Sequence, residues 1–436
     1  MKLAVYGGRP VRSEPFPAYN TIGPEEKAAV ERVLDSGILS RFLGSWHEDF
    51  YGGPEVRALE KEWAEYFGVR HAVAVNSCTS GLYCAVGATA VEPGEEIIVT
   101  PYTMSATAMA PLIYNAIPVF SDVEEDFFCL DPGLIEEKIT PGTRAIIAVD
   151  IFGQPYDADA VNAIAEKHGL LVIEDTAQSP GALYRGRFAG TLGDIGVYSL
   201  NYHKHIHCGE GGIVVTDNDE LAEKVRLIRN HAESVVEGKG VTDLVNMVGF
   251  NFRMTELEAA VARCQLRKLD GLLKERQDNC AYLSEQLGHI PAIVPPETRP
   301  GCTHSYYVHA CKFREDVAGV SRNTFIEAVK AELPPFRSRE GEGVKIGCGY
   351  VKPLYLRPLF QKKIAYGSKG FPFTAPWREG EIDYSEGICP VVERLHTTEL
   401  FTHELMQPQM TGEDMDDVVK AFRKVWENRE QLREDG

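Results

Sequence analysis

The stretch Ser199-Leu-Asn-Tyr-His-Lys204-His-Ile-His-Cys-Gly209-Glu-Gly-Gly212 places one lysine between an apolar run and a glycine cluster. Apolar residues dominate positions 195–200 before it and 213–216 after it, which predicts a tight connection between two buried strands. An ammonium held away from water is costly unless it is paired or gives up its proton. Desolvated lysines form Schiff bases with carbonyl compounds, whereas many lysines beside loops simply extend into solvent. The stretch alone leaves both roles open for Lys204.

A carboxylate stands at the end of a second apolar run, residues 170–173. This run predicts a core strand, and Glu174 and Asp175 follow it at the carboxyl end, where α/β sheets place their ligands. A pyridoxal phosphate site needs a lysine for the aldehyde, a carboxylate for the pyridinium nitrogen, a phosphate cradle and a group on the ring face. Lys204 and Asp175 supply the first two.

Several motifs in compatible order resemble those of one family. They are Glu-Asp-Thr-Ala-Gln at 174–178, Gly-Thr-Leu-Gly-Asp-Ile-Gly at 190–196, and Ser199 and Lys204 followed by Gly-Glu-Gly-Gly at 209–212. Together they resemble the DegT/DnrJ/EryC1/StrS family of pyridoxal-phosphate-dependent sugar and cyclitol aminotransferases. The resemblance implies that Lys204 holds pyridoxal 5′-phosphate and moves the proton during transfer, while Asp175 keeps the pyridine nitrogen protonated.

The phosphate cradle is expected at residues 76–81, Asn-Ser-Cys-Thr-Ser-Gly, just after the first core strand. Hydroxyls and free backbone N–H groups at a helix start favour an anion, although an ordinary Ser/Thr N-cap has the same pattern. The resemblance implies that Cys78 and Thr79 bind the phosphate, with Cys78 where the family usually has glycine. It also implies that Ser199 donates to this phosphate and that Asn251 reaches it from the other subunit.

Two further cofactor contacts are implied by the resemblance. Gln178 matches a His or Gln position that contacts the ring oxygen O3′, and its alternative role is that of a capping amide. Met104 stands where the family commonly has an aromatic residue stacked on the pyridine, and a thioether can also cover a π-face. Tyr102 nearby is then expected in the core.

Short apolar runs alternate with helical patterns along most of the chain. They are continuous rather than alternating in polarity, which is typical of strands covered on both faces of a mostly parallel sheet. With the resemblance, this predicts an α/β protein of fold type I, like aspartate aminotransferase, with helices on both faces and a smaller C-terminal α+β domain. The strand-like runs are residues 72–75, 96–100, 117–120, 144–149 and 170–173.

We expect three parts in the chain. Residues 1–53 would form an N-terminal arm and first helix, residues 54–275 a large cofactor-binding domain, and residues 276–436 a small domain. A long helical pattern at 255–287 leads out of the large domain, and an amphipathic pattern at 414–432 ends the chain.

Composition limits the classes of partner. The sequence has 45 Lys and Arg against 64 Asp and Glu, a net charge of −19, which argues against nucleic acid or an anionic membrane as a partner. No apolar run is long enough for a membrane span or a signal peptide. Ten cysteines without paired spacing predict reduced thiols in a cytoplasmic protein.

A metal site is the main competing interpretation of the lysine stretch. His203, His205 and His207 would share one face of an extended strand beside Cys208, as metal ligands can. We expect no metal, because the cofactor accounts better for Lys204 and the glycines. The histidines could instead bind substrate hydroxyls or surround the phosphate.

The predicted reaction moves an amino group from glutamate or glutamine to a keto-sugar, nucleotide-linked or phosphorylated, or to a keto-cyclitol. By resemblance the protein is a homodimer with shared active sites, and the arm at residues 7–17 lies across the partner. Alternatives are a related sugar dehydratase, against which Lys204 argues, and a non-catalytic cofactor-binding regulator. Residues 335–377 are expected to shape the acceptor pocket.

Overall fold

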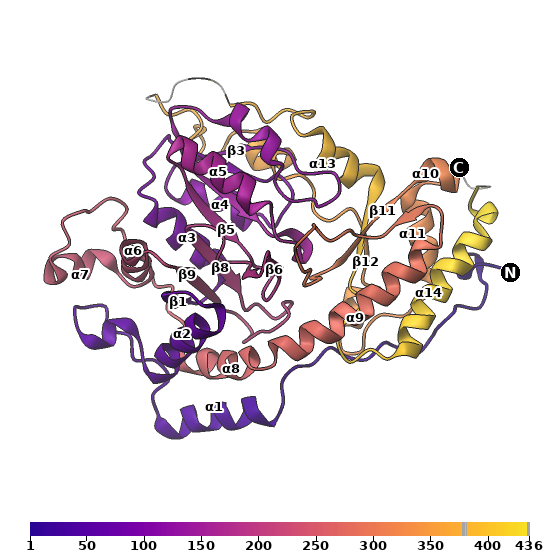
Figure 1. The fold of residues 1–436 in the computed structure, drawn as a ribbon, viewed down its shortest axis with the longest axis horizontal. Coiled ribbons are helices and arrows are strands. Elements are labelled where there is room, and N and C mark those ends of the chain that lie inside the picture. Colours follow the sequence, from indigo (N-terminus) through magenta and orange to yellow (C-terminus); the bar gives the residue numbers. More distant parts are fainter. Residues whose placement is uncertain (377–379, 381, 434–436) are drawn as a thin grey trace.

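The computed structural model describes residues 1–376, 380 and 382–433, so Trp377 of the expected acceptor segment and residues 434–436 lie outside the described residues. Within this part, seven strands form a sheet in the order β1-β9-β8-β5-β4-β2-β3 (Figure 1). All neighbours are parallel except β9, which runs antiparallel to β1 and β8. The five expected strands are confirmed. The bounds are β1 His71–Val75, β2 Glu96–Val99, β3 Ile117–Phe120, β4 Thr143–Val149, β5 Leu171–Asp175, β8 Ile195–Ser199 and β9 Gly212–Thr216.

Helices cover both faces of this sheet, as the continuous apolar runs predict. Val73 and Val214 point into a core shared with α3, whereas Ala72 and Ile213 point into the core that holds α2 and α8. Within the described residues, no helix has both the length and the apolar character needed to cross a membrane. The helices around this sheet are α1 Pro24–Ser36, α2 Pro54–Phe67, α3 Cys78–Ala88, α4 Ala106–Ile113, α5 Ala158–His168, α6 Asp219–Arg229, α7 Ala232–Lys239 and α8 Glu256–Leu266.

A second, antiparallel sheet follows in the order β10-β11-β13-β12, with its own apolar core. Its strands are β10 Ile293–Val294, β11 His309–Phe313, β12 Ile346–Cys348 and β13 Leu400–His403. A short hairpin, β6 Leu183–Tyr184 with β7 Arg187–Phe188, lies apart from both sheets. The remaining helices are α9 Leu269–Gly288, α10 Glu315–Ala318, α11 Arg322–Ala331, α12 Pro358–Gln361, α13 Pro390–Arg394 and α14 Gly412–Glu427.

The long helical pattern at residues 255–287 is two helices rather than one. α8 ends at Leu266, and α9 begins at Leu269 and runs on to the second sheet. At the break, Lys268 Nζ lies 2.7 Å from a Glu26 oxygen and 2.9 Å from the Thr21 carbonyl oxygen. The apolar spacing continues through this point, and for that reason the break was not predicted from the pattern.

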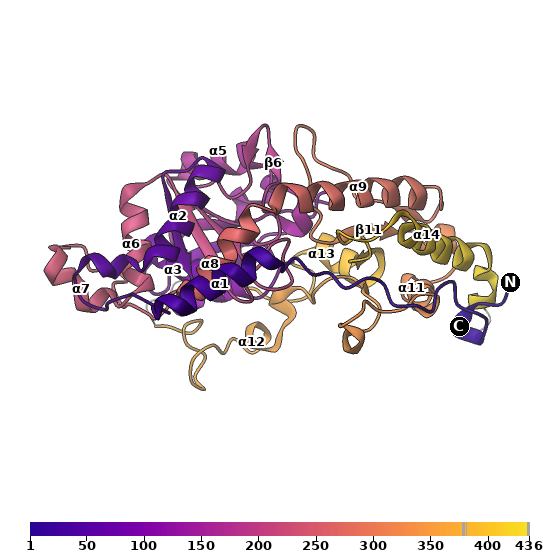
Figure 2. The same cartoon turned by 90° about the horizontal axis from the view of Figure 1, so that it is seen from below.

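The N-terminal arm is anchored to the second sheet and its helices within its own chain. Figure 2 shows it running past α11 and α14 before it reaches α1. Leu3 and Phe16 are fully buried in the second core, and Glu332 accepts the backbone N–H of Ala4 at 2.8 Å and of Val11 at 3.1 Å. These buried residues hold the arm against its own chain, and the placement of residues 7–17 across a partner stays a prediction.

Candidate active site

A cavity of about 480 Å³ lies at the carboxyl end of the large sheet. Parallel strands end at the same edge, and the loop between β8 and β9 closes over that edge. Of the eight residues that the sequence analysis proposes for the cofactor, seven line this cavity. They are Cys78, Thr79, Met104, Asp175, Gln178, Ser199 and Lys204.

Lys204 lies in the loop of residues 200–211, in the tight connection that the sequence predicts. Its backbone N–H donates to the Asn201 carbonyl at 2.9 Å, which turns the chain directly after β8. The ammonium lies 4.1 Å from the centre of the Tyr307 ring, a cation–π contact. The side chain is therefore directed into the cavity and held against an aromatic face.

Asp175 is the last residue of β5 and is 4% exposed. One carboxylate oxygen accepts the Thr107 hydroxyl at 2.7 Å, and the other accepts the Ala177 N–H at 3.2 Å. Burial raises the pKa of this carboxyl above its ordinary value, and the two hydrogen bonds and the charge of Lys204 offset this in part. A buried carboxylate in this position is well suited to a cationic ring nitrogen.

The start of α3 lines the same cavity as Lys204 and has the features of an anion site. Ser77 is the N-cap and accepts the N–H of Ser80 at 3.0 Å. Within the described residues, the N–H groups of Cys78 and Thr79 have no protein acceptor, as expected for the first turn of a helix. Ser199 adds its hydroxyl to the same cavity.

Gly212 allows the two parts of this cradle to come together. A Cβ at this position would lie 2.6 Å from the backbone nitrogen of Cys78 and 2.7 Å from the carbonyl oxygen of Ser77. A side chain here would push β9 away from the start of α3. The close approach of β9 to the start of α3 therefore explains why a glycine stands at position 212.

Both the oxygen and the nitrogen of the Gln178 side-chain amide form hydrogen bonds within the protein. Its oxygen accepts the N–H of Phe152 at 2.8 Å, and its nitrogen donates to the Tyr350 hydroxyl at 3.0 Å. The second hydrogen on this nitrogen is available to a ring oxygen. Tyr350 was not predicted as a site residue, and burial raises its pKa to about 12.

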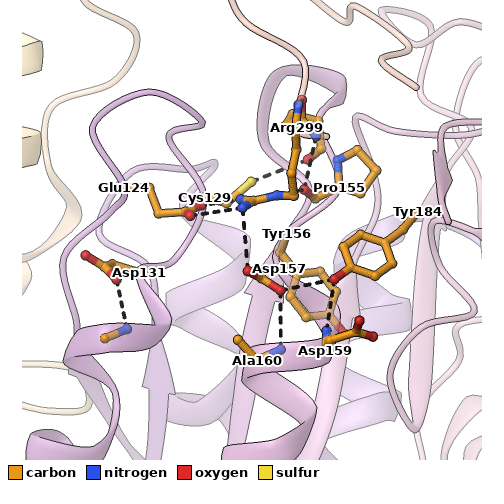
Figure 3. Close-up of polar contacts among 12 residues, drawn as sticks. Glu124, Cys129, Asp131, Pro155, Tyr156, Asp157, Asp159, Ala160, Tyr184 and Arg299 are labelled. Carbon is orange, nitrogen blue, oxygen red and sulfur yellow. Dashed lines mark hydrogen bonds and ion pairs between the residues drawn. The ribbon is translucent and has the colours of Figure 1, made fainter. Parts of the chain in front are cut away.

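Tyr307 was also not predicted as a site residue. Its position is set by backbone contacts of residues 305–307 with residues 152 and 153. Its N–H donates to the Phe152 carbonyl at 2.7 Å, and Gly153 has a φ of 109° where a Cβ would collide with the neighbouring Tyr306. Upstream, Arg299 makes a bidentate contact with Glu124 and lies near Asp157, as Figure 3 shows. This partly buried ion pair holds the segment leading to Tyr307 against the loop that follows β3.

Met104 is largely exposed, and Asn251 lies outside the cavity of its own chain. Met104 lines the cavity and is 58% exposed, and its sulfur accepts the Ser105 hydroxyl at 3.7 Å. Asn251 is exposed and does not line the cavity of its own chain, and its side-chain oxygen accepts from Arg253 at 2.7 Å. Tyr102 is fully buried, as expected.

The three alternating histidines of the lysine loop do not share one face. The loop turns instead of continuing as a strand. His203 lies 3.1 Å from an Arg339 nitrogen, His205 donates to the Ser305 carbonyl at 2.9 Å, and His207 lies on the side of Glu26. Their different partners do not form a set of metal ligands.

Within the described residues, one buried group has the ligand types of a metal site: His309, Cys311 and His403. His403 accepts the N–H of Leu405 at 3.2 Å, so its other ring nitrogen carries the proton and donates to His309 at 2.9 Å. The far nitrogen of His309 donates to Ser284 at 2.8 Å. These hydrogen bonds satisfy every ring nitrogen of the group without an ion.

Residues 20–423 match the model of the DegT/DnrJ/EryC1/StrS aminotransferase family. The chain belongs to this family. It is 33% identical over 446 aligned positions to an L-glutamine:2-deoxy-scyllo-inosose aminotransferase of Streptoalloteichus tenebrarius, with 99% of each protein covered. It is 32% identical to the spore coat polysaccharide biosynthesis protein SpsC of Bacillus subtilis, covering 93% of this chain and 95% of that protein.

A solved structure gives the same result for the fold. The structure of DesI, determined with its TDP-sugar product, superposes with a TM-score of 0.79 at 27% identity and covers 99% of this chain and 97% of DesI. The chain is therefore an aminotransferase with the type I fold of pyridoxal-phosphate-dependent enzymes, as the sequence predicts.

Proposed function

We propose that this aminotransferase moves an amino group from glutamine or glutamate to a keto-cyclitol, or to a keto-sugar, with pyridoxal 5′-phosphate in the cavity at Lys204. The observation that carries the proposal is that Lys204, Asp175 and the start of α3 line one cavity. They match the aldehyde, the pyridine nitrogen and the phosphate of that cofactor. The inosose aminotransferase relative, which matches this chain from end to end, supports a polyhydroxylated cyclic ketone as the acceptor.

The roles of the residues follow from their positions. Pyridoxal phosphate, when bound, supplies a ring that withdraws electrons and carries the amino group between the two substrates. Lys204 would bind the aldehyde carbon through Nζ and, once the donor amine displaces it, would take the proton from the donor Cα. Asp175 would hold the proton on the ring nitrogen, helped by the Thr107 hydroxyl. Lys204 would return a proton when the acceptor ketone is aminated.

The other predicted residues would hold the group in place. The N–H groups of Cys78 and Thr79 and the Ser199 hydroxyl would bind the phosphate at the helix start. Gln178 would donate its free hydrogen to the ring oxygen, and Met104 would cover the ring face.

We also propose a homodimer in which Asn251 completes the partner's site, because this exposed asparagine does not line its own cavity. All ten cysteines are free, which supports the proposal that the protein works in the reducing cytoplasm.

The direct test separates the two half-reactions. Protein reconstituted with pyridoxal phosphate should lose the absorbance of the aldehyde form when glutamine or glutamate is added, and the isolated amino form should then aminate 2-deoxy-scyllo-inosose. A nucleotide-linked keto-sugar and a keto-sugar phosphate should be assayed in parallel, with Lys204→Ala as the inactive control. Amination of neither class by a protein that accepts the donor amine would contradict the proposed acceptor.

A further inference from the structure

His203 stands next to Lys204 in the chain and lines the same cavity. Its Nδ1 lies 3.1 Å from the Arg339 guanidinium. Because a guanidinium can only donate, Nδ1 must accept, and the proton of a neutral ring is then on Nε2. Nε2 makes no hydrogen bond within the described residues, so it is a donor without a partner.

Arg339 is held in place from behind. Glu342 accepts two of its N–H groups at 2.7 Å each, and Glu404 lies 3.5 Å from a third nitrogen. The ring of Tyr202 lies 3.7 Å from the His203 ring, centre to centre. Arg339 therefore fixes the tautomer of the imidazole from outside the cavity, and Tyr202, which lines the cavity, packs against the ring.

The same surroundings keep His203 uncharged. Burial lowers its pKa, Arg339 and Lys345 lower it further, and Glu404 and Glu342 oppose this only in part. A neutral N–H is suited to a hydroxyl or carbonyl oxygen. It adds little for an amino acid carboxylate, which a cation would stabilise far more.

We propose that His203 is an acceptor-binding residue, donating Nε2–H to an oxygen of the polyhydroxylated ketone, and that Arg339 is a positioning residue that fixes its tautomer. This inference rests on the proposed function. It assigns acceptor binding to the residue beside Lys204, and the positioning of that residue to an arginine 136 positions further along the chain. The donor half-reaction would not use this hydrogen bond.

The test measures both half-reactions in His203→Phe, which keeps a flat ring but removes the donor, and in His203→Gln, which keeps an N–H near Nε2. His207→Phe is the matched control, because His207 lies in the same loop but does not line the cavity. We expect His203→Phe to lower kcat/KM for the acceptor about tenfold while the donor half-reaction stays within about twofold. His203→Gln should recover most of the loss.

Two further readouts exclude a merely structural role. Binding of the polyol that corresponds to the acceptor, which has no carbonyl to aminate, should weaken by a similar factor in His203→Phe. In ¹⁵N-labelled protein, His203 should show the Nε2–H tautomer, and Arg339→Met should convert it to a mixture.

The possible outcomes are distinct. Wild-type protein that takes the amino group but aminates no polyhydroxylated ketone would contradict the proposed function and this inference together. Wild-type turnover with equal losses in both half-reactions of His203→Phe, or with no loss in either, would overturn this inference alone. An Nδ1–H tautomer in the wild-type protein would also overturn it.

Discussion

Replacing Asp175 by asparagine tests the electronic role of this carboxylate with little change in shape. The side chain is nearly fully buried, and it is held by hydrogen bonds from Thr107 and Ala177. Asparagine can accept only one of them, and it leaves a protonated ring nitrogen without its counter-charge. Removing one partner of a buried ion pair costs about 3–5 kcal/mol. At about 1.4 kcal/mol per factor of ten, the donor half-reaction should slow by roughly 10²–10⁴-fold.

The measurement is stopped-flow absorbance of the reconstituted variant mixed with glutamine, with cofactor content determined first. The phosphate cradle is unchanged in this variant, so most of the cofactor should remain bound. Asp122→Asn is the matched control, because Asp122 is another buried carboxylate, one that binds only backbone N–H groups outside the cavity. Near-normal turnover of Asp175→Asn with full cofactor occupancy would refute the assignment.

The same substitution should change how the stability of the cofactor-free protein depends on pH. Burial raises the pKa of Asp175 above its ordinary value of 3.8, so the folded state binds this proton more tightly than the unfolded chain does. The free energy of unfolding therefore falls as the pH rises from the unfolded pKa to the folded one, by about 1.4 kcal/mol per unit of difference. Asp175→Asn should lack this decline in urea unfolding measured across that range. A decline of the same size in the variant would show that Asp175 is not its source.

Three other predictions concern the rest of the site. Borohydride reduction and peptide mapping should place the pyridoxyl group on Lys204, and labelling of another lysine would contradict the central assignment. Mixing inactive Lys204→Ala chains with inactive Asn251→Asp chains should restore part of the activity, because one site of each hybrid dimer regains both residues. No recovery in proven hybrids would contradict a shared site. Tyr350→Phe should weaken cofactor binding about fivefold through loss of the bond to Gln178. The factor should be the same at pH 7 and pH 10 in equilibrium binding, because the pKa of about 12 keeps the phenol protonated.

The predictable part of the site is the part that local sequence determines. Lys204, Asp175 and Cys78 each follow a short apolar run, and runs that become parallel strands deliver their ends to one edge of the sheet. Their meeting in one cavity could therefore be anticipated from the order of the strands. Their motifs are also those that carry the family resemblance.

Tyr307 had no comparable signal, and Tyr350 and Arg339 fall in residues 335–377, for which a pocket role was predicted without naming any single residue. They come from loops around the second sheet, and they reach the cavity through packing between distant segments, such as the contact of Tyr307 with Phe152. Thr107 was missed for a related reason, because a threonine on an apolar helix does not reveal that it faces Asp175 until β5 and α4 are placed together. The break between α8 and α9 depends on Lys268 and Glu26, far apart in the chain.

The residues that local motifs predict and the residues that distant packing places are expected to serve different parts of the reaction. Lys204, Asp175 and the start of α3 all belong to the large sheet and the elements around it, and in the proposed reaction they hold the cofactor that carries the amino group. The positions of Tyr307, Tyr350 and His203, which line the same cavity, and of Arg339, which contacts His203, depend on how the second sheet packs against the first. We expect substitutions there to alter which ketone is accepted while Lys204 and Asp175 stay in place. Substrate differences among relatives that are only about one-third identical to this chain are therefore expected at the contact between the two sheets.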